Sequence, residues 1–295
     1  MPRAEAKSDW HELKQALRDQ DIAFTDAKPR AVGGGDISSA WQVPTERGPI
    51  FLKTGPLEFL ETFSAEAEGL EELRSANAVR VPAVLAFGKS GSDAYIALEW
   101  LDFDGRNSAA EVLLGRQLAL QHRRVDRRFG WHRDNMIGTT PQLNDRDDDW
   151  IRFYRDRRLL VQLQLAESLG FGGELLQEGA RLARNLEPLF EGYAPVPSLL
   201  HGDLWGGNWS SVAGEPVIFD PAVHYGDRES DLAMTRLFGG FGSGFYRAYE
   251  DEWPLAKGHE KRVAIYQLYH VLNHLNMFGA SYRPRALELI RELLR

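Results

Sequence analysis

The fold is decided by residues 199–225, which read LLHGDLWGGNWSSVAGEPVIFDPAVHY. The segment holds two short apolar runs with polar residues beyond each: Asp203 and Asn208 follow the first run, and Asp220 follows the second. Two short strands joined by a Gly-Glu-Pro turn at 214–216 are predicted to fold the segment back on itself. We expect this hairpin to bring Asp203, Asn208 and Asp220 to one end, close enough to share a metal ion and a substrate.

Two carboxylates and an amide in this order match what phosphoryl transfer requires. The transferred group needs no protein nucleophile, so catalysis rests on positioning and on electrostatic stabilisation. One carboxylate accepts the proton of the attacking hydroxyl, while an amide oxygen and a second carboxylate hold magnesium. The kinase template H-R-D-x-x-x-x-N followed by D-F-G has the same order of roles, with Gly202 here in place of arginine and Asp220-Pro-Ala in place of D-F-G. The alternative is a structural hairpin with surface carboxylates and a capping asparagine. We favour a kinase because the base, the amide ligand and the carboxylate ligand occur in the order of the kinase template.

Composition bounds the classes of protein that the chain can belong to. Its 295 residues suffice for two lobes, and 43% hydrophobic with 26% charged residues is ordinary for a globular protein. The net charge of −8 argues against a nucleic-acid or anionic-membrane partner. Cysteine is absent, which excludes disulfides, thiolate metal sites and a cysteine nucleophile. With no apolar signal core at the N-terminus and no run long enough to span a bilayer, a soluble cytoplasmic protein is expected.

A glycine-rich stretch near the N-terminus is a candidate phosphate loop. Gly33, Gly34 and Gly35 precede a strand-like run that ends near Val43. Glycine lacks a Cβ, so the tip of a β-turn-β there can approach phosphates with free backbone amides. The spacing departs from the kinase G-x-G-x-x-G pattern, and an ordinary flexible turn is the alternative.

A lysine on a short strand is the next candidate. Residues 50–54, IFLKT, form an apolar strand that carries Lys53, in the setting of the kinase strand lysine that pairs with phosphates and with a helix glutamate. Residues 63–73 are predicted to be a helix, and Glu66 and Glu68 are the two candidates for that pairing. The alternatives are an edge-strand lysine that serves solubility and glutamates that are merely solvated.

Two further strands and a polar boundary complete the first lobe. The strands are predicted at 81–87 and 94–101, and in a kinase the second would end at the hinge that binds the adenine edge. The hinge residues assigned to the nucleotide are Glu99, Trp100 and Leu101. A polar stretch with a glycine follows, so we divide the chain into a small β-rich nucleotide-binding N-lobe at 1–101 and a larger, mainly helical C-lobe at 102–295.

Three patterns in the C-lobe have structural interpretations. Arginines between 150 and 160 are interpreted as a surface face of salt bridges, because acidic residues flank them. The helix predicted after the hairpin segment carries Asp231, which we expect to brace the catalytic loop through backbone amides. His270 and His274 have the i, i+4 spacing of zinc ligands, but the glutamate of an HExxH motif is missing between them, so core histidines are favoured.

These residues resemble a known family. HGDLWGGNW at 201–209, FDPAVHYGDRESDLAMTRLFGGF at 219–241 and FGWHRDNMIGTTPQ at 129–142 are similar to the fructosamine kinase (ketosamine-3-kinase) family. FYRDRRL at 153–159 and LYHVLNHLNMFG at 268–279 extend the likeness over nearly the whole chain. The family belongs to the aminoglycoside- and choline-kinase-like branch, so the resemblance implies an α+β, bilobal protein-kinase-like fold.

The resemblance also implies the reaction and the roles of individual residues. Members are ATP-dependent kinases that phosphorylate the O3 hydroxyl of a free or protein-bound ketosamine, and the product decomposes to release the amine, which is deglycation. Asp203 matches the catalytic base, and Asn208 and Asp220 match the ligands of Mg²⁺. Trp205 follows the base and is a candidate to pack against the sugar ring, with core packing as the alternative. The positions that match the nucleotide site are Lys53, Glu66 as its partner in preference to Glu68, and the loop residues Gly33, Gly34, Gly35, Ile37 and Ser38.

Two other interpretations stay open. One is an aminoglycoside or other metabolite phosphotransferase of the same fold. Cationic aminoglycosides require an acidic acceptor cleft, which the overall charge does not reveal. A non-catalytic kinase-like binding protein would lack a base, a metal ligand or the lysine, and all three are present. The sequence leaves open the preferred sugar, the kind of amine, the choice of ATP or GTP, and the oligomeric state.

Overall fold

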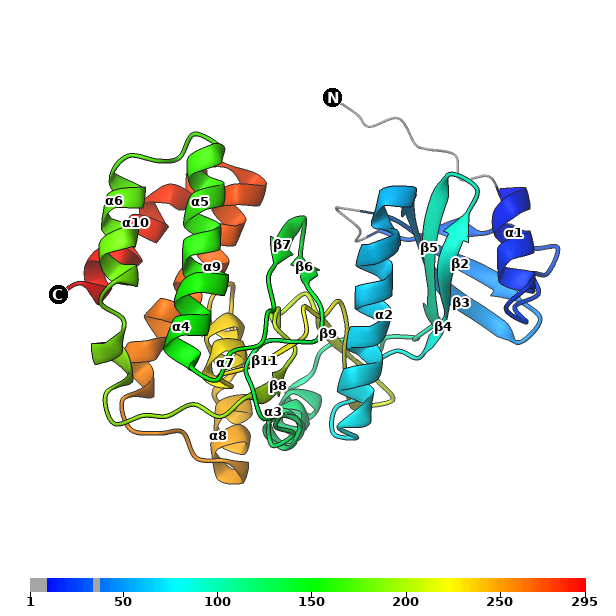
Figure 1. Cartoon of the computed structure of the whole chain (residues 1–295). Coiled ribbons are helices and arrows are strands. Elements are labelled where there is room, and N and C mark those ends of the chain that lie inside the picture. Colours follow the sequence, from blue (N-terminus) through cyan, green and yellow to red (C-terminus); the bar gives the residue numbers. More distant parts are fainter. Residues whose placement is uncertain (1–9, 34–37) are drawn as a thin grey trace. The chain divides into compact units, whose positions relative to one another are not determined.

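The computed structural model describes residues 10–33 and 38–295, and Figure 1 shows the elements along the chain. The chain divides into two compact units: unit 1 comprises Met1–Glu71 and Val81–Phe103, and unit 2 comprises Glu72–Arg80 and Asp104–Arg295. The division suggested by the sequence groups residues 72–80 with the N-lobe, whereas in the structure they pack with unit 2. Backbone pairing accounts for this, because the Ile218 amide donates to the Arg80 carbonyl at 3.0 Å.

Unit 1 is built around a five-stranded antiparallel sheet in the order β1-β2-β3-β5-β4. In β3, Ile50, Leu52 and Thr54 are buried on one face, and Lys53 lies on the other. This alternation is the period-two pattern of a strand, and it turns the lysine away from the buried face. The strands are β1 (Arg30–Ala31), β2 (Ser39–Thr45), β3 (Gly48–Pro56), β4 (Val84–Ser90) and β5 (Asp93–Glu99).

Unit 1 also contains α1 (Trp10–Arg18) and most of α2 (Leu60–Ser75), which follows a short 3₁₀ turn at Leu57–Phe59. The last residues of α2, from Glu72, belong to unit 2. Leu13 and Leu17 of α1 lie one turn apart and are buried in one cluster with residues of the sheet. Full burial of each such side chain stabilises the fold by roughly 2 kcal/mol. As the sequence predicts, α2 buries its apolar residues, which are Phe63, Leu70 and Leu73.

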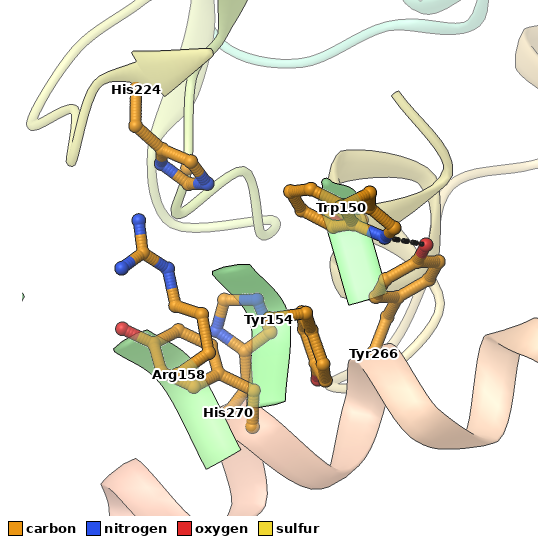
Figure 2. A pocket seen from close by; sticks show the side chains of 9 residues that line it. Trp150, Tyr154, Arg158, His224, Tyr266 and His270 are labelled. Atoms are coloured by element: carbon orange, nitrogen blue, oxygen red, sulfur yellow. Dashed lines mark hydrogen bonds between the residues drawn. The ribbon is translucent and has the colours of Figure 1, made fainter. Parts of the chain in front are cut away.

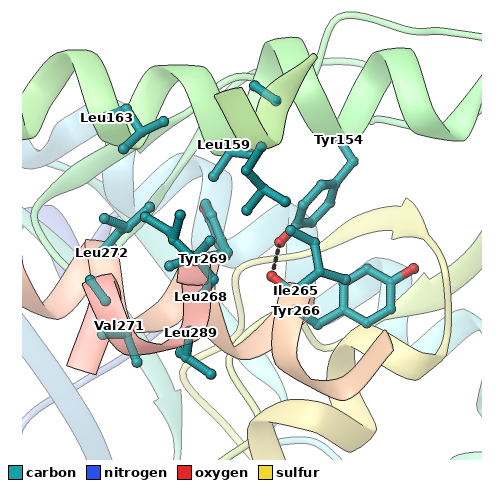
Figure 3. Packing of buried hydrophobic residues seen from close by; sticks show 14 of the residues in the cluster. Tyr154, Leu159, Leu163, Ile265, Tyr266, Leu268, Tyr269, Val271, Leu272 and Leu289 are labelled. Atoms are coloured by element: carbon teal, nitrogen blue, oxygen red, sulfur yellow. Dashed lines mark hydrogen bonds between the residues drawn. The ribbon is translucent and has the colours of Figure 1, made fainter. Parts of the chain in front are cut away.

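Unit 2 is mainly helical, and its core lies around α9 (His259–Phe278). Figure 3 shows Leu268 and Leu272 of α9 packed with Leu159, Leu163 and Leu289. In the described part of the chain no helix is both long and apolar enough to cross a membrane. The other helices are α3 (Ser108–His122), α4 (Trp150–Tyr154), α5 (Leu160–Ser168), α6 (Glu174–Ala183), α7 (Glu229–Thr235), α8 (Ser243–Glu252) and α10 (Arg283–Leu293), with 3₁₀ turns at Glu187–Phe190 and Ala280–Tyr282.

The arginine-rich segment departs from its predicted surface position at one residue. Arg152, Arg155 and Arg157 form ion pairs near the surface, as predicted, with Asp147, Asp156 and Asp145. Arg158 is instead buried, donates to the Asn144 side chain at 2.7 Å and lies 4.7 Å from the centre of the Phe153 ring. The prediction is wrong for this residue because Arg155–Leu159 is a π-helical turn, which adds a residue to the turn and rotates Arg158 towards the core.

Three small antiparallel hairpins or pairs position the loops of unit 2: β6 (Asn135–Ile137) with β7 (Thr140–Gln142), β8 (Ser198–Leu200) with β11 (His224–Gly226), and β9 (Trp209–Val212) with β10 (Glu215–Ile218). The β6-β7 hairpin lies within the stretch 129–144, for which the sequence shows no regular period. Asn135 donates to the Val223 carbonyl at 2.8 Å, and Gln142 donates to the Ala222 carbonyl at 3.0 Å. These side chains hold the backbone that follows Asp220.

Candidate active site

The segment 199–225 folds back as predicted, but its turn lies elsewhere. The tight turn between β9 and β10 is Ala213-Gly214, with φ of 52° and 80°, while Glu215 and Pro216 belong to β10. Two residues with positive φ are typical of the type I′ turn, whose twist suits a two-residue hairpin. The predicted turn at 214–216 is therefore wrong, because alanine seldom adopts positive φ and gives no turn signal.

The hairpin brings the three predicted side chains to its open end. The Phe219 amide donates to the Asn208 carbonyl at 3.1 Å, so Asn208 and the residue before Asp220 face each other beyond the last strand pair. The Asn208 Nδ2 donates to the Asp203 backbone oxygen at 2.9 Å, to Asp203 Oδ2 at 3.2 Å and, weakly, to the Asp220 carbonyl at 3.5 Å. With Nδ2 occupied in this way, the amide has Oδ1 to offer to a ligand.

Asp220 has an unusual backbone conformation. Its φ is 55°, in the left-handed region that non-glycine residues rarely adopt. The surrounding bonds hold it there: the Ala222 amide donates to the His201 carbonyl at 2.8 Å, and the His201 Nε2 lies 3.0 Å from the Phe219 carbonyl. Conformations of this kind persist where neighbouring structure enforces them, and they cluster at functional sites.

Gly202 is required by its surroundings. Its φ is 85°, and a Cβ built on it would lie 2.0 Å from the Ala222 carbonyl oxygen. No side chain fits at that distance without displacing backbone. The close approach of the two loops therefore explains why glycine stands where the kinase template has arginine.

Asp231 braces the loop formed by residues 201–208, as predicted. It is buried on α7 and accepts the His201 amide at 2.8 Å and the Gly202 amide at 2.9 Å. Burial alone would raise the pKa of Asp231, but the hydrogen bond from His122, together with the bond from the Gly202 amide, outweighs burial and holds the pKa below its usual range. The carboxylate therefore stays ionised while it holds both amides.

The surroundings of Asp203 disfavour the ionised form of its carboxyl group. Burial raises the pKa of Asp203 to about 7, the negative charge of Asp220 adds to the increase, and the hydrogen bond from Asn208 opposes it. A carboxylate whose proton affinity is raised in this way is a better proton acceptor, which suits a general base near neutral pH.

Trp205 is exposed beside the base. Its side chain is 40% exposed, which excludes the alternative of core packing. Its amide donates to the Asp203 carbonyl at 3.1 Å, and the indole lies over Gly207, where a Cβ would come within 2.2 Å of the ring. The missing side chain at Gly207 thus leaves room for the indole ring.

In unit 1, Lys53 and Glu66 form an ion pair. The Lys53 Nζ lies 2.7 Å from Glu66 Oε1, and both side chains are 13% exposed. Glu68, the other candidate, accepts a bond from Ser64 on its own helix at 3.3 Å. The preference for Glu66 as the partner of Lys53 agrees with this geometry, because Lys53 on β3 and Glu66 on α2 meet across the fold of unit 1.

The remaining candidates of unit 1 lie on loops and at a strand end. Gly33 and Ser38 lie on either side of residues 34–37, which are outside the described residues, so the predicted phosphate contacts at Gly34, Gly35 and Ile37 stay predictions. Glu99 ends β5 and accepts the Ala83 amide at 3.2 Å. At the predicted hinge the Trp100 indole donates to Asp102 at 2.7 Å and Leu101 is buried.

A small cavity of about 10 Å³ lies under the 201–208 loop in unit 2. Gly202 lines it, and Figure 2 shows Arg158 between His224 and His270, whose imidazoles also line it. Both histidines are buried, as the core interpretation of His270 predicts. Burial, with a smaller effect of Arg158 on His224 and of His274 on His270, lowers the pKa of each imidazole to about 3.

Acid is expected to destabilise the fold through these two histidines. Each folded-state pKa lies below the unfolded value of about 6.5, so the unfolded chain binds more protons and stability falls as the pH decreases from about 6.5 towards about 3. Between about pH 6.5 and pH 5 the loss is roughly 2 kcal/mol per histidine. The midpoint of urea unfolding measured across this range should shift accordingly. His270→Gln should weaken the dependence and the exposed His11→Gln should not; the same dependence in both variants would refute the assignment.

Sequence reasoning missed the residues behind Asp231. His122 is the last residue of α3, buried completely, with its Nε2 3.1 Å from Asp231 Oδ2 and its Nδ1 2.8 Å from the Tyr249 hydroxyl. These partners lie 109 and 127 residues away along the chain, so no local sequence pattern indicates that His122 contacts them.

A family model described as fructosamine kinase matches residues 9–295. The chloroplastic protein-ribulosamine 3-kinase of Arabidopsis thaliana is 43% identical over 270 residues, which cover 90% of this chain and 82% of that one. A crystal structure from Haemophilus somnus, provisionally assigned as a fructosamine-3-kinase, superposes with a TM-score of 0.88 at 28% identity and covers 97% of this chain and 98% of that one.

A more distant structure bears on the fold alone. The aminoglycoside phosphotransferase APH(4)-Ia is 15% identical, with a TM-score of 0.64 over 96% of this chain and 98% of that one. The predicted α+β protein-kinase-like fold is thereby confirmed. The match of the family model over nearly the whole sequence also confirms the resemblance drawn from the motifs, and the chain belongs to the fructosamine kinase family.

Proposed function

We propose that this protein is an ATP-dependent kinase that phosphorylates the O3 hydroxyl of ketosamines such as fructosamine or ribulosamine. The observation that carries the proposal is the cluster of Asp203, Asn208 and Asp220 at the open end of the β9-β10 hairpin, in a chain of this family. Phosphorylation at O3 gives a product that decomposes and releases the amine. The biological outcome is deglycation of small-molecule or protein-bound amines.

The donor set near the base suits magnesium. Mg²⁺ is usually bound through one or two carboxylates together with substrate phosphates and water, and not by a full protein cage. Asn208 and Asp220 offer an amide oxygen and a carboxylate of this kind. When bound, the ion neutralises charge on the phosphates.

Unit 1 supplies the residues assigned to the nucleotide. Lys53, held by Glu66, would present its ammonium group to the α- and β-phosphates, and the glycine-rich stretch 33–38 remains the predicted phosphate loop. The adenine edge is assigned to the backbone of residues 99–101. The ion pair orients the Lys53 side chain, so it contributes to positioning the nucleotide.

The acceptor is oriented by unit 2. Asp203 accepts the proton of the O3 hydroxyl as that oxygen forms its bond to the γ-phosphorus and the bond from phosphorus to the leaving ADP oxygen breaks. The loop amides held by Asp231 fix the direction of Asp203. Trp205 offers an exposed indole face against which the apolar face of a sugar ring packs.

The test is Mg²⁺-dependent release of ADP from ATP with matched acceptors. The protein is expected to turn over a fructosamine or ribulosamine, but neither the same compound lacking its O3 hydroxyl nor an aminoglycoside. Analysis of the product should place the phosphate on O3, and a glycated peptide compared with a free ketosamine measures the preference between the two. Turnover of the aminoglycoside without turnover of any ketosamine would refute the proposal and favour the related phosphotransferases.

A further inference from the structure

A chain of buried hydrogen bonds continues outwards from Asp231. Asp231 Oδ2 lies 3.1 Å from His122 Nε2, His122 Nδ1 lies 2.8 Å from the Tyr249 hydroxyl, and that hydroxyl accepts a bond from Arg228 at 3.1 Å. All four side chains are buried. His122 ends α3, Tyr249 lies on α8, Asp231 lies in α7, and Arg228 is the residue that immediately precedes α7.

The chemistry of the two ends fixes the direction of the outer bonds. A guanidinium only donates and a carboxylate only accepts. Arg228 therefore donates to the Tyr249 oxygen, and His122 donates from Nε2 to Asp231. In the neutral imidazole Nδ1 is then an acceptor, so it accepts the Tyr249 hydroxyl. Burial lowers the pKa of His122 more than Asp231 raises it, so the imidazole is neutral and carries its single proton on Nε2.

The outer end of the chain is anchored to the segment after α8. Arg228 also donates to the Trp253 carbonyl at 2.9 Å and to the Pro254 carbonyl at 2.6 Å, and its guanidinium lies 3.9 Å from the centre of the Trp253 ring. A guanidinium held by two carbonyls and a ring has one orientation. Arg228 consequently offers the Tyr249 hydroxyl a fixed donor.

We propose that His122, Tyr249 and Arg228 are positioning residues that hold Asp231, and through it the backbone of the 201–208 loop, in the geometry that aims Asp203. Asp231 accepts the His201 and Gly202 amides, which immediately precede Asp203. A carboxylate can satisfy two amides only when its plane is fixed, and His122 Nε2 supplies the third bond that fixes it. The effect on turnover rests on the function proposed above, whereas the order of the loop does not.

Tyr249→Phe is the sharpest test, because it removes one hydroxyl and keeps the ring. His122 then lacks its donor and is free to change tautomer, so its bond to Asp231 weakens. Tyr246→Phe is the matched control: Tyr246 lies one turn earlier on α8, and its hydroxyl is 3.2 Å from the Thr235 hydroxyl, outside the chain. Amide hydrogen exchange of peptide 199–204 should be about tenfold faster in Tyr249→Phe and unchanged in Tyr246→Phe. Equal exchange in the two variants would overturn the proposal.

Kinetics and a second pair of variants separate positioning from general loss of structure. In Tyr249→Phe, kcat should fall about tenfold while the KM for ATP stays constant. His122→Gln retains an N–H near the Nε2 position, so its kcat should exceed that of His122→Leu, which has no donor for Asp231. Equal kcat in these two folded variants would also contradict the proposal. If no ketosamine is turned over at all, the proposed function fails, and the exchange of peptide 199–204 alone decides the role of the three residues.

Discussion

Asp203→Asn is expected to lower kcat by on the order of 10³-fold, the range that a general base contributes. The amide matches the carboxylate in shape but does not accept the proton of the attacking hydroxyl. The Asn208 bond to the backbone oxygen of residue 203 does not depend on the side chain and should persist. Because the loss is confined to the transition state, the KM for ATP and the affinity for ADP should change little.

The same substitution should leave the protein at least as stable as the parent. Burial and the charge of Asp220 both disfavour the ionised form of Asp203 and raise its pKa to about 7, so a neutral side chain removes an unfavourable contribution to stability. Urea unfolding and single-turnover kinetics measure the two effects, with Asp251→Asn on the exposed surface of α8 as the control. Turnover within tenfold of the parent enzyme would show that another group accepts the proton.

Asp231→Asn is expected to destabilise the fold by about 3 kcal/mol, because it breaks a buried, charged hydrogen-bond centre. The carboxylate accepts three bonds, from the His201 amide, the Gly202 amide and His122. An asparagine must point its own N–H₂ group at one of these donors whichever way it is turned. At least one buried donor then loses its partner, and the remaining bonds lose the contribution of the charge.

The urea midpoint and kcat are expected to fall together in this variant. Asp251→Asn again provides the comparison, since removing an exposed carboxylate should change stability by less than about 0.5 kcal/mol. A full loss of turnover with an unchanged midpoint would mean that Asp231 acts directly in the reaction and not as a brace of the 201–208 loop.

Local spacing was sufficient to predict the centre of the site. The two apolar runs around 199 and 217 place Asp203, Asn208 and Asp220 beyond the ends of a hairpin, and the structure shows them together. The ion pair of Lys53 with Glu66 follows from a strand lysine and a following helix. Family resemblance, not spacing, distinguished Glu66 from Glu68.

The features that sequence reasoning missed have physical causes that leave no local pattern. The hairpin turn depends on Ala213 at positive φ, against the preference of that residue. Arg158 is buried because a π-helical turn shifts the register of the helix, which a 3.6-residue period does not anticipate. His122 acquires its role only from tertiary contacts with α7 and α8.

The contact of Gly202 with Ala222 also limits how this enzyme can evolve. Protein kinases order their activation loops by pairing arginine with a phosphorylated residue, and their H-R-D motif carries an arginine next to the base. Here any side chain at that position collides with the carbonyl oxygen of Ala222, 2.0 Å from the first carbon that it would add. A single codon change therefore does not lead from this loop to one that senses phosphorylation; two backbone segments would have to move together. The close contact between the two loops therefore prevents a single substitution from placing an arginine beside the base.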